Sequence, residues 1–128
     1  MIYLDSSVVL AQIFAEDRSL PSSVAGQALI SSRLLEYEVW NRVHARGFTH
    51  SHSEEVAAIF ARLPLVDLTS EVLGRALLPF PMAVRTLDSL HLATMEFLRA
   101  HGEEISLASF DRRLTTCAQA LGIALYPL

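Results

Sequence analysis

The chain has 128 residues, of which 52% are hydrophobic and 19% charged, and its formal net charge at pH 7 is −4. That length fits one domain, residues 1–128, and the apolar content excludes a disordered chain. No apolar run approaches the roughly 20 residues of a membrane span, and the N-terminus lacks the pattern of a secretory signal; we therefore expect a cytoplasmic protein without membrane contact. The single cysteine, Cys117, excludes an intramolecular disulfide and a thiolate zinc site.

All ten basic residues are arginines, and the chain contains no lysine. A negative net charge does not favour nucleic-acid binding, which usually comes with a basic surface. If four of the fourteen acidic residues gather around metal ions, however, the remaining ten balance the ten arginines. The whole-chain charge therefore leaves nucleic-acid binding open.

Short apolar runs alternate with segments of helical periodicity along the chain. In chain order they predict a strand at 2–4, a helix at 6–14, a strand at 28–30, a helix to about 46, a helix ending before Pro64, a strand at 65–68, a helix at 69–78, a helix at 86–101, a strand at 105–108, a helix at 111–121 and a strand at 123–126. Strands that alternate with helices predict an α/β fold. We expect a mainly parallel sheet of about five strands, covered by helices on both faces.

Capping residues and helix breakers mark the ends of these helices. The first helix is expected to begin at Ser6 or Ser7, and the expected N-terminal caps of later helices are Ser31 or Ser32, Ser51 or Ser53, Thr69 and Asp111. The expected stops are Gly47, Gly102 and Gly122, and the stretch DRSLPSS at 17–23 breaks the first helix.

Two acidic residues fall at the ends of predicted strands. Asp5 ends the first strand, and Asp111 follows the fourth after Ser109 and Phe110. In parallel α/β sheets, ligands bind in the crevice beyond the carboxyl ends of the strands. Asp111 also has a simple reading as a helix cap, whereas a charge at the tip of a core strand gains nothing unless something binds it.

Two further acids lie on helices at positions that need an explanation. Glu38 projects from the apolar face of its helix, although a salt bridge with Arg42 one turn away is an alternative. Glu36 competes for the same role from the opposite side of that helix. Asp88 lies in a first helical turn, where a carboxylate also stabilises the helix terminus.

Together, Asp5, Glu38, Asp88 and Asp111 predict a group of carboxylates at one edge of the sheet. Two carboxylates about 4–5 Å apart repel by around 3–4 kcal/mol at an effective dielectric of 20, so such a group should take up protons or cations. Oxygen-only ligands favour Mg²⁺ or Mn²⁺, and such a site can activate water for phosphodiester cleavage.

Neighbouring polar residues can support this site. Ser7 and Ser109 lie beside the acids and could orient carboxylates or waters, although capping explains them nearly as well. His91 has helical ligand spacing from Asp88, but a structural role is the favoured interpretation. No glycine-rich phosphate loop and no G-x-S-x-G motif occurs, which excludes those modes of nucleotide binding and serine hydrolysis.

Four stretches of the sequence resemble the acidic motifs of the PIN domain, in the small form found in VapC toxins. They are LDSS, SSRLLEYEVWNR, RTLDSLHLA and SFDRRL, and the resemblance covers essentially the whole chain. It implies a three-layer α/β/α sandwich and a Mg²⁺- or Mn²⁺-dependent endoribonuclease that halts translation. Position by position, the family's four acids fall on Asp5, Glu38, Asp88 and Asp111. Many relatives carry threonine after the first aspartate, where this chain has Ser6.

The resemblance also implies partners. They are an RNA substrate, a cognate VapB-like antitoxin and a second copy of the chain in a homodimer. Four arginines are candidates for contact with the RNA backbone: Arg42, Arg85, Arg112 and Arg113.

Two rival functions remain. An aspartate-based phosphatase or receiver domain uses a lysine near the phosphate, which this chain lacks, and the phosphatase also needs an acid where Ser7 stands. A catalytically silent PIN-like module that binds RNA or protein is the second rival, and retention of all four acids argues against it.

Overall fold

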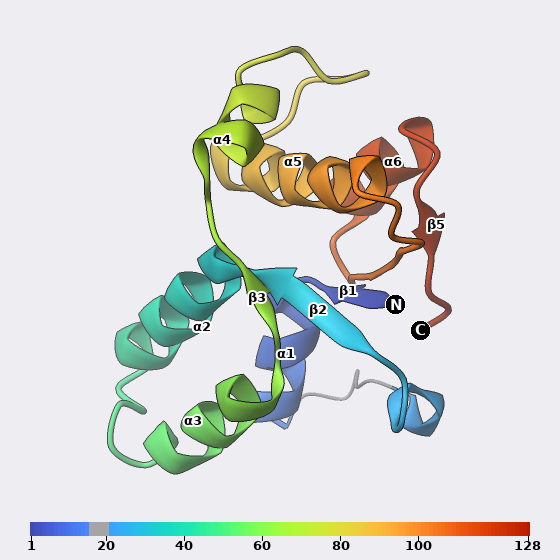
Figure 1. Cartoon of the computed structure of the whole chain (residues 1–128). Helices are drawn as coiled ribbons and strands as arrows, with labels where there is room; N and C mark the ends of the chain where they lie inside the picture. Colours follow the sequence, from blue (N-terminus) through green and yellow to red (C-terminus); the bar gives the residue numbers. More distant parts are fainter. Residues whose placement is uncertain (16–20) are drawn as a thin grey trace.

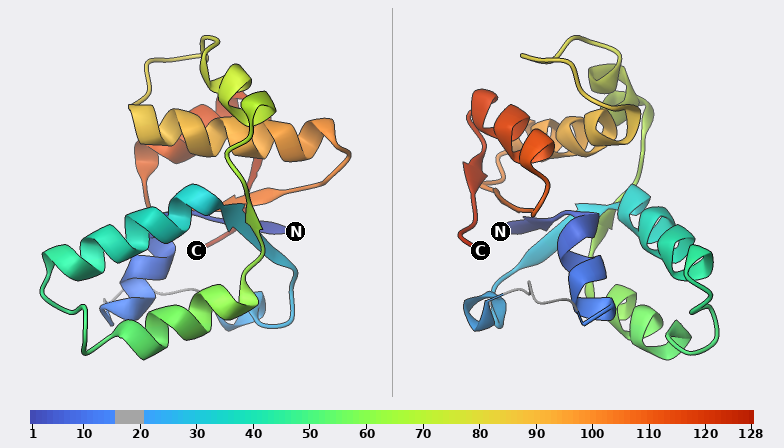
Figure 2. Two further views of the ribbon diagram at one scale, coloured as in Figure 1. Left: turned by 60° about the vertical axis from the view of Figure 1, so that its left-hand side comes forward. Right: turned by 180° about the vertical axis from the view of Figure 1, so that it is seen from behind.

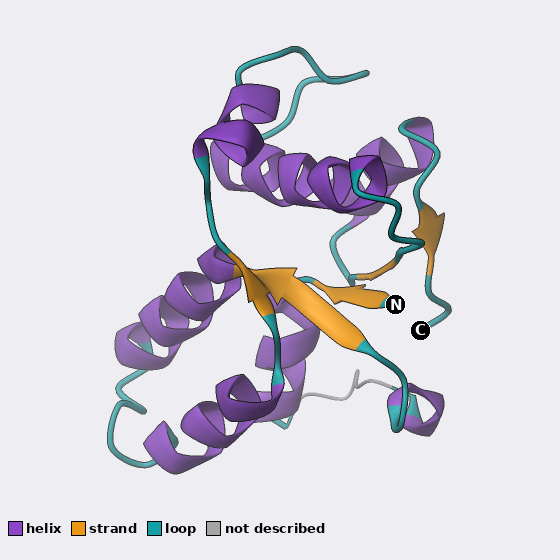
Figure 3. Cartoon of the chain, viewed as in Figure 1, coloured by secondary structure: helices purple, strands orange, loops and turns teal. Residues whose placement is uncertain are grey.

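The computed structural model describes residues 1–15 and 21–128, so residues 17–20 of the predicted break lie outside the described residues. Its strands are β1 (Ile2–Leu4), β2 (Leu29–Ser32), β3 (Leu65–Val66), β4 (Ser106–Ala108) and β5 (Ala124–Leu125). Its helices are α1 (Ser6–Ile13), α2 (Arg33–Ala45), α3 (Ser53–Arg62), α4 (Ser70–Ala76), α5 (Thr86–Ala100) and α6 (Arg112–Ala120), with a short 3-10 helix at Ser22–Val24 (Figure 1, Figure 3).

The strands form one parallel sheet in the order β3-β2-β1-β4-β5. β1 lies at its centre, with Ile2 opposite Leu29 of β2 on one side and Ser106 of β4 on the other. The predicted parallel sheet of about five strands is therefore confirmed.

Helices cover both faces of this sheet. Helices α1, α2 and α3 lie on one side, and α4, α5 and α6 lie on the other (Figure 1, Figure 2). Successive side chains of a strand point to opposite faces. Accordingly, Ile2 and Leu4 pack with Val8 and Val39 in one core, while Tyr3 packs with Leu92 in the other. The three-layer α/β/α arrangement expected from the resemblance is confirmed.

Most predicted helix boundaries are correct. Ser32 caps α2, Thr69 caps α4 and Asp111 caps α6, each through a side-chain hydrogen bond to a backbone N–H. Gly122 follows α6 with φ of +80°, a conformation that glycine adopts without strain. Cys117 is buried, as a small filler of the core.

The cap predicted for α3 is wrong. His52, without a side-chain cap bond, occupies the position expected for Ser51 or Ser53. Both hydroxyls have other partners, because Ser51 Oγ lies 2.7 Å from His52 Nδ1 and Ser53 Oγ donates to the His50 carbonyl.

Strand ends also differ from the prediction. β3 stops at Val66, because Asp67 turns to the surface and accepts a hydrogen bond from Arg33 at 3.1 Å. β5 comprises only Ala124–Leu125, although the Tyr126 N–H still donates to the Leu107 carbonyl at 2.8 Å.

The path of the chain creates a crevice at the carboxyl ends of β1 and β4. The chain runs from the central β1 outward to β2 and β3, then returns to place β4 on the opposite side of β1. Loops that leave two such strands diverge to opposite faces and leave a gap between them, which is where ligands bind in these folds. Within residues 1–15 and 21–128, no helix has the length and apolar character that crossing a membrane requires.

Candidate functional site

Asp5 occupies the junction between β1 and α1 and is almost completely buried, with 5% of its surface exposed. Its Oδ2 accepts hydrogen bonds from Ser7 Oγ at 2.6 Å, from Ser109 Oγ at 2.8 Å and from the Ser7 backbone N–H at 3.3 Å. Every hydrogen bond that the described residues give to Asp5 reaches Oδ2, which leaves Oδ1 available to a ligand.

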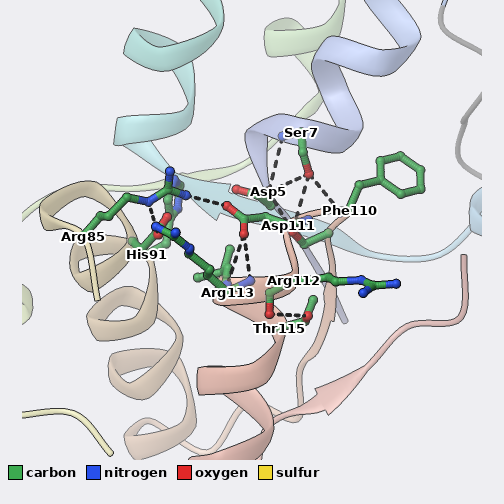
Figure 4. A network of polar contacts seen from close by, with 12 residues as sticks. Asp5, Ser7, Arg85, His91, Phe110, Asp111, Arg112, Arg113 and Thr115 are labelled. Carbon is green, nitrogen blue, oxygen red and sulfur yellow. Dashed lines mark hydrogen bonds and ion pairs between the residues drawn. The ribbon is translucent and has the colours of Figure 1, made fainter. Parts of the chain in front are cut away.

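The two serines tie the end of β1 to the end of β4. Ser7 Oγ accepts a hydrogen bond from the Phe110 backbone N–H, and Ser109 Oγ accepts one from the Asp111 N–H, each at 2.9 Å (Figure 4). The loop after β4 is thus held against the start of α1, and Asp5 and Asp111 are brought to the same place. We call this set of contacts the serine clasp: Asp5, Ser7, Ser109 and the backbone of residues 110–111.

Asp111 has two roles at once. Its Oδ1 accepts from the backbone N–H groups of Arg113 and Leu114, which caps α6, and its Oδ2 accepts from Arg85 Nη2 at 2.8 Å. The helix cap and the site role were alternatives in the sequence, but the structure shows that the two oxygens of one carboxylate can serve both.

Arg85 joins Asp111 to Asp88. Its Nε donates to Asp88 Oδ2 at 3.1 Å. Nη2 of the same guanidinium donates to Asp111 Oδ2 (Figure 4). The Asp88 side chain is 13% exposed and that of Arg85 is 59% exposed. The hydrogen bond to Asp88, together with the negative charges of Asp88 and Asp111, raises the pKa of Arg85 above its ordinary value.

Glu38 pairs with His91, a partner that the sequence did not predict for it. His91 Nε2 donates to Glu38 Oε1 at 2.5 Å, and His91 Nδ1 lies 2.7 Å from the Tyr3 hydroxyl. His91 and Tyr3 are completely buried. This chain of contacts fixes a carboxylate of α2 against α5 and β1, whereas the sequence offered Arg42 as the partner.

Burial and charge oppose each other at His91. Burial, the largest single influence, lowers the pKa of His91, but the hydrogen bond to Glu38 and the negative charges of Glu38, Asp5 and Asp88 together outweigh it and raise that pKa. Burial has the opposite effect on the Tyr3 hydroxyl, whose pKa it raises, because the charged form of tyrosine is the deprotonated one. The described residues leave no buried side-chain nitrogen or oxygen without a hydrogen-bond partner.

All four predicted acids line one cleft of about 460 Å³, which we call the acidic cleft. Its lining residues are Asp5, Ser6, Ser7, Leu10, Tyr37, Glu38, Asn41, Arg42, Arg85, Thr86, Leu87, Asp88 and Asp111. The cleft lies at the crevice between β1 and β4, where the topology places a ligand site.

The other candidate residues lie at its edge or elsewhere. Ser109 lies behind Asp5, and Arg113 lines an adjacent cleft that shares Arg85 and Asp88 with the acidic cleft. Arg112 points away from the guanidinium of Arg85 (Figure 4). Glu36 does not line the acidic cleft and lies 3.7 Å from Arg33 in an exposed ion pair.

The acidic cleft suits a hard divalent cation in the kind of donor it offers. Four carboxylates from four distant segments supply oxygen ligands only, which Mg²⁺ and Mn²⁺ prefer. Among the described residues, however, no three His, Cys, Asp or Glu side chains are already arranged to hold a metal ion. Asp88 and Asp111 instead accept hydrogen bonds from Arg85, and Glu38 accepts one from His91.

Sequence reasoning found one part of the support of the site and missed another. Ser7 and Ser109 were expected to orient carboxylates, and both donate to Asp5, so that its burial does not by itself require a ligand. His91 was set aside as structural, and the only sequence signal for its contact with the acids was its spacing of three residues from Asp88.

Comparisons with known proteins show the family of the chain and agree with its fold. A model of the PIN domain family matches residues 2–119. Proteins named Ribonuclease VapC35, from two strains of Mycobacterium tuberculosis, are 29% identical over 129 aligned positions, which span 97% of this chain and 94% of theirs. The crystal structure of M. tuberculosis VapC20, described as a sarcin–ricin-loop-cleaving toxin, is similar in fold, with a TM-score of 0.70 at 18% identity over the full length of both chains.

Proposed function

Because the chain belongs to the PIN-domain family, we propose that it is a Mg²⁺- or Mn²⁺-dependent endoribonuclease and the toxin of a VapBC-type toxin–antitoxin pair. The observation that carries this proposal is the convergence of Asp5, Glu38, Asp88 and Asp111 on one cleft. The whole-length similarity to proteins named as VapC ribonucleases supports it. Residues 1–128 then form a single nuclease domain that acts in the cytoplasm.

In this proposal the four carboxylates hold the metal, and their protein contacts set their positions. A bound divalent cation supplies an activated water and neutralises charge on the phosphodiester. The serine clasp holds Asp5 with Oδ1 free, and His91 holds Glu38 through one oxygen while the other remains available. A carboxylate that is not fully engaged can accept the proton of the attacking water.

The arginines at the cleft complement the RNA backbone. Arg42 and Arg85 line the acidic cleft itself, and Arg113 lines the adjacent one. Positive side chains at these places can bind the phosphates on either side of the cut bond. They place positive charges at the cleft, although the whole chain has a negative net charge. Arg112 contributes from the outer side of α6.

The proposal includes two protein partners. An antitoxin would restrain the nuclease, and a second copy of the chain would form a homodimer. Exposed apolar side chains on and after α4 support an interface of this kind, since Leu73, Leu77 and Leu78 are 41%, 87% and 59% exposed.

The test is cleavage of total RNA by the purified protein with Mg²⁺, Mn²⁺ or EDTA, followed by mapping of the cut ends. We expect metal-dependent cuts at defined positions, and their loss in Asp5→Asn and Asp88→Asn, whose folding is checked by circular dichroism. Cleavage that survives EDTA, or that persists in either folded variant, would contradict the proposed site.

A catalytically silent RNA-binding module is the second candidate. It is favoured by one observation, the pairing of Asp88 and Asp111 with Arg85. Binding of RNA in a gel-shift measurement, without any metal-dependent cut in the cleavage assay, would support this alternative.

A further inference from the structure

Arg85 lies where a cation is needed. It immediately precedes α5, and its guanidinium donates to Asp88 Oδ2 at 3.1 Å. The same guanidinium donates to Asp111 Oδ2 at 2.8 Å (Figure 4). These two acids are 23 residues apart in the sequence, and both line the acidic cleft. Two neighbouring carboxylates repel, and the fork of one arginine neutralises that repulsion through two separate N–H groups.

The contacts of Arg85 are incompatible with those of a metal ion in the same cleft. Asp111 Oδ1 caps α6, so a divalent cation that binds Asp111 needs the Oδ2 atom to which Arg85 donates. If the cation also binds Asp88, it lies close to the same guanidinium. A guanidinium and a divalent cation so near to each other would also repel. The absence of a ready set of three metal-ligating side chains among the described residues fits this conflict.

The side chain of Arg85 also has space to move away from Asp88 and Asp111. Its side chain is 59% exposed, and it borders both the acidic cleft and the adjacent cleft lined by Met82, Val84 and Arg113. Exposed ion pairs are weak, so releasing this side chain costs little compared with moving a buried one.

We propose that Arg85 is the resident counter-cation of the acidic cleft, which a divalent metal ion must displace in order to bind. Arg85 therefore lowers the affinity of the protein for the metal, and its displaced guanidinium becomes available to a phosphate of the bound RNA. This inference rests on the proposed metal-dependent function. It gives Arg85 a role before substrate binds, in addition to the RNA contact already suggested for it.

The test is titration of Mn²⁺ into the RNA-free protein, by calorimetry and by the electron paramagnetic resonance signal of free Mn²⁺. We expect Arg85→Ala to bind Mn²⁺ about two- to fivefold more tightly than the unaltered chain, a change of the size that an exposed ion pair contributes. Arg85→Lys, which keeps the charge but loses the fork, should fall between the two.

Two control variants separate displacement from a general change of charge. Arg33 bridges Glu36 and Asp67 with its side chain 51% exposed, so Arg33→Ala removes a similar bridge outside the acidic cleft. Arg113 bonds to Asp111 through its backbone N–H, so Arg113→Ala removes a nearby charge and keeps that bond. Both should bind Mn²⁺ more nearly like the unaltered chain than like Arg85→Ala.

The possible results distinguish a failure of the displacement role of Arg85 from a failure of the proposed nuclease function. If the unaltered chain binds Mn²⁺ and Arg85→Ala binds it equally or more weakly, the displacement role is wrong while the nuclease proposal stands. Equal tightening in Arg113→Ala and Arg85→Ala would also overturn it, because charge alone would then explain the effect. If neither protein binds Mn²⁺, the proposed function fails and this inference fails with it.

Discussion

At the scale of single residues, the choice between Glu36 and Glu38 decides which face of α2 the site uses. Glu38 lines the acidic cleft and is held by buried His91, whereas Glu36 is 39% exposed and pairs with Arg33. The two carboxylates belong to one helix and differ by two positions, so they form a natural matched pair.

We predict that Glu38→Gln lowers the rate of metal-dependent RNA cleavage by about 10²-fold or more, while Glu36→Gln leaves it within about twofold. The glutamine at 38 retains the size of the side chain but loses the charge that a metal ligand or base requires. Rates measured under single-turnover conditions check this. Equal losses of cleavage rate in the two variants would contradict the assignment of Glu38 as the second acid of the site.

At the scale of elements, the serine clasp is the contact that brings two strand ends together. Ser109 follows β4 and donates to Asp5 after β1, while its oxygen also accepts from the Asp111 N–H. Removing this hydroxyl takes one of three hydrogen bonds from Asp5 Oδ2 and leaves the Asp111 N–H without its partner.

We therefore expect Ser109→Ala to lower the free energy of unfolding by about 1–2 kcal/mol, measured by urea denaturation. Ser106→Ala, in β4 and only partly buried, is the control, and we expect a change below about 0.5 kcal/mol. If Ser109→Ala is as stable as this control, the clasp does not hold the strand ends.

Much of this element-level organisation was predictable from sequence. Short apolar runs and caps such as Thr69 and Asp111 are local signals, and they located the strands and most helix ends. The α3 cap was missed because Ser51 and Ser53 bond to His52 and His50 instead, a choice that depends on the three-dimensional turn.

At the scale of the whole molecule, the strand order is what gathers distant acids. Sequence reasoning placed Asp5 and Asp111 at one sheet edge, because parallel strands align their carboxyl ends. It could not predict the partners of Asp111 and Glu38. Arg85 is 26 positions from Asp111, and His91 is 53 positions from Glu38. Such pairings depend on how helices pack across the sheet.

The central claim is that four carboxylates from separate segments act as one metal site. The most direct measurement is the thermal unfolding midpoint of the purified chain with and without excess Mn²⁺, compared with Asp5→Asn. A ligand at 100 times its Kd that binds only the folded state stabilises by about 2.7 kcal/mol. We predict a clear rise in Tm for the unaltered chain and none for Asp5→Asn. An unchanged Tm in the former, or an equal rise in both, would contradict the claim.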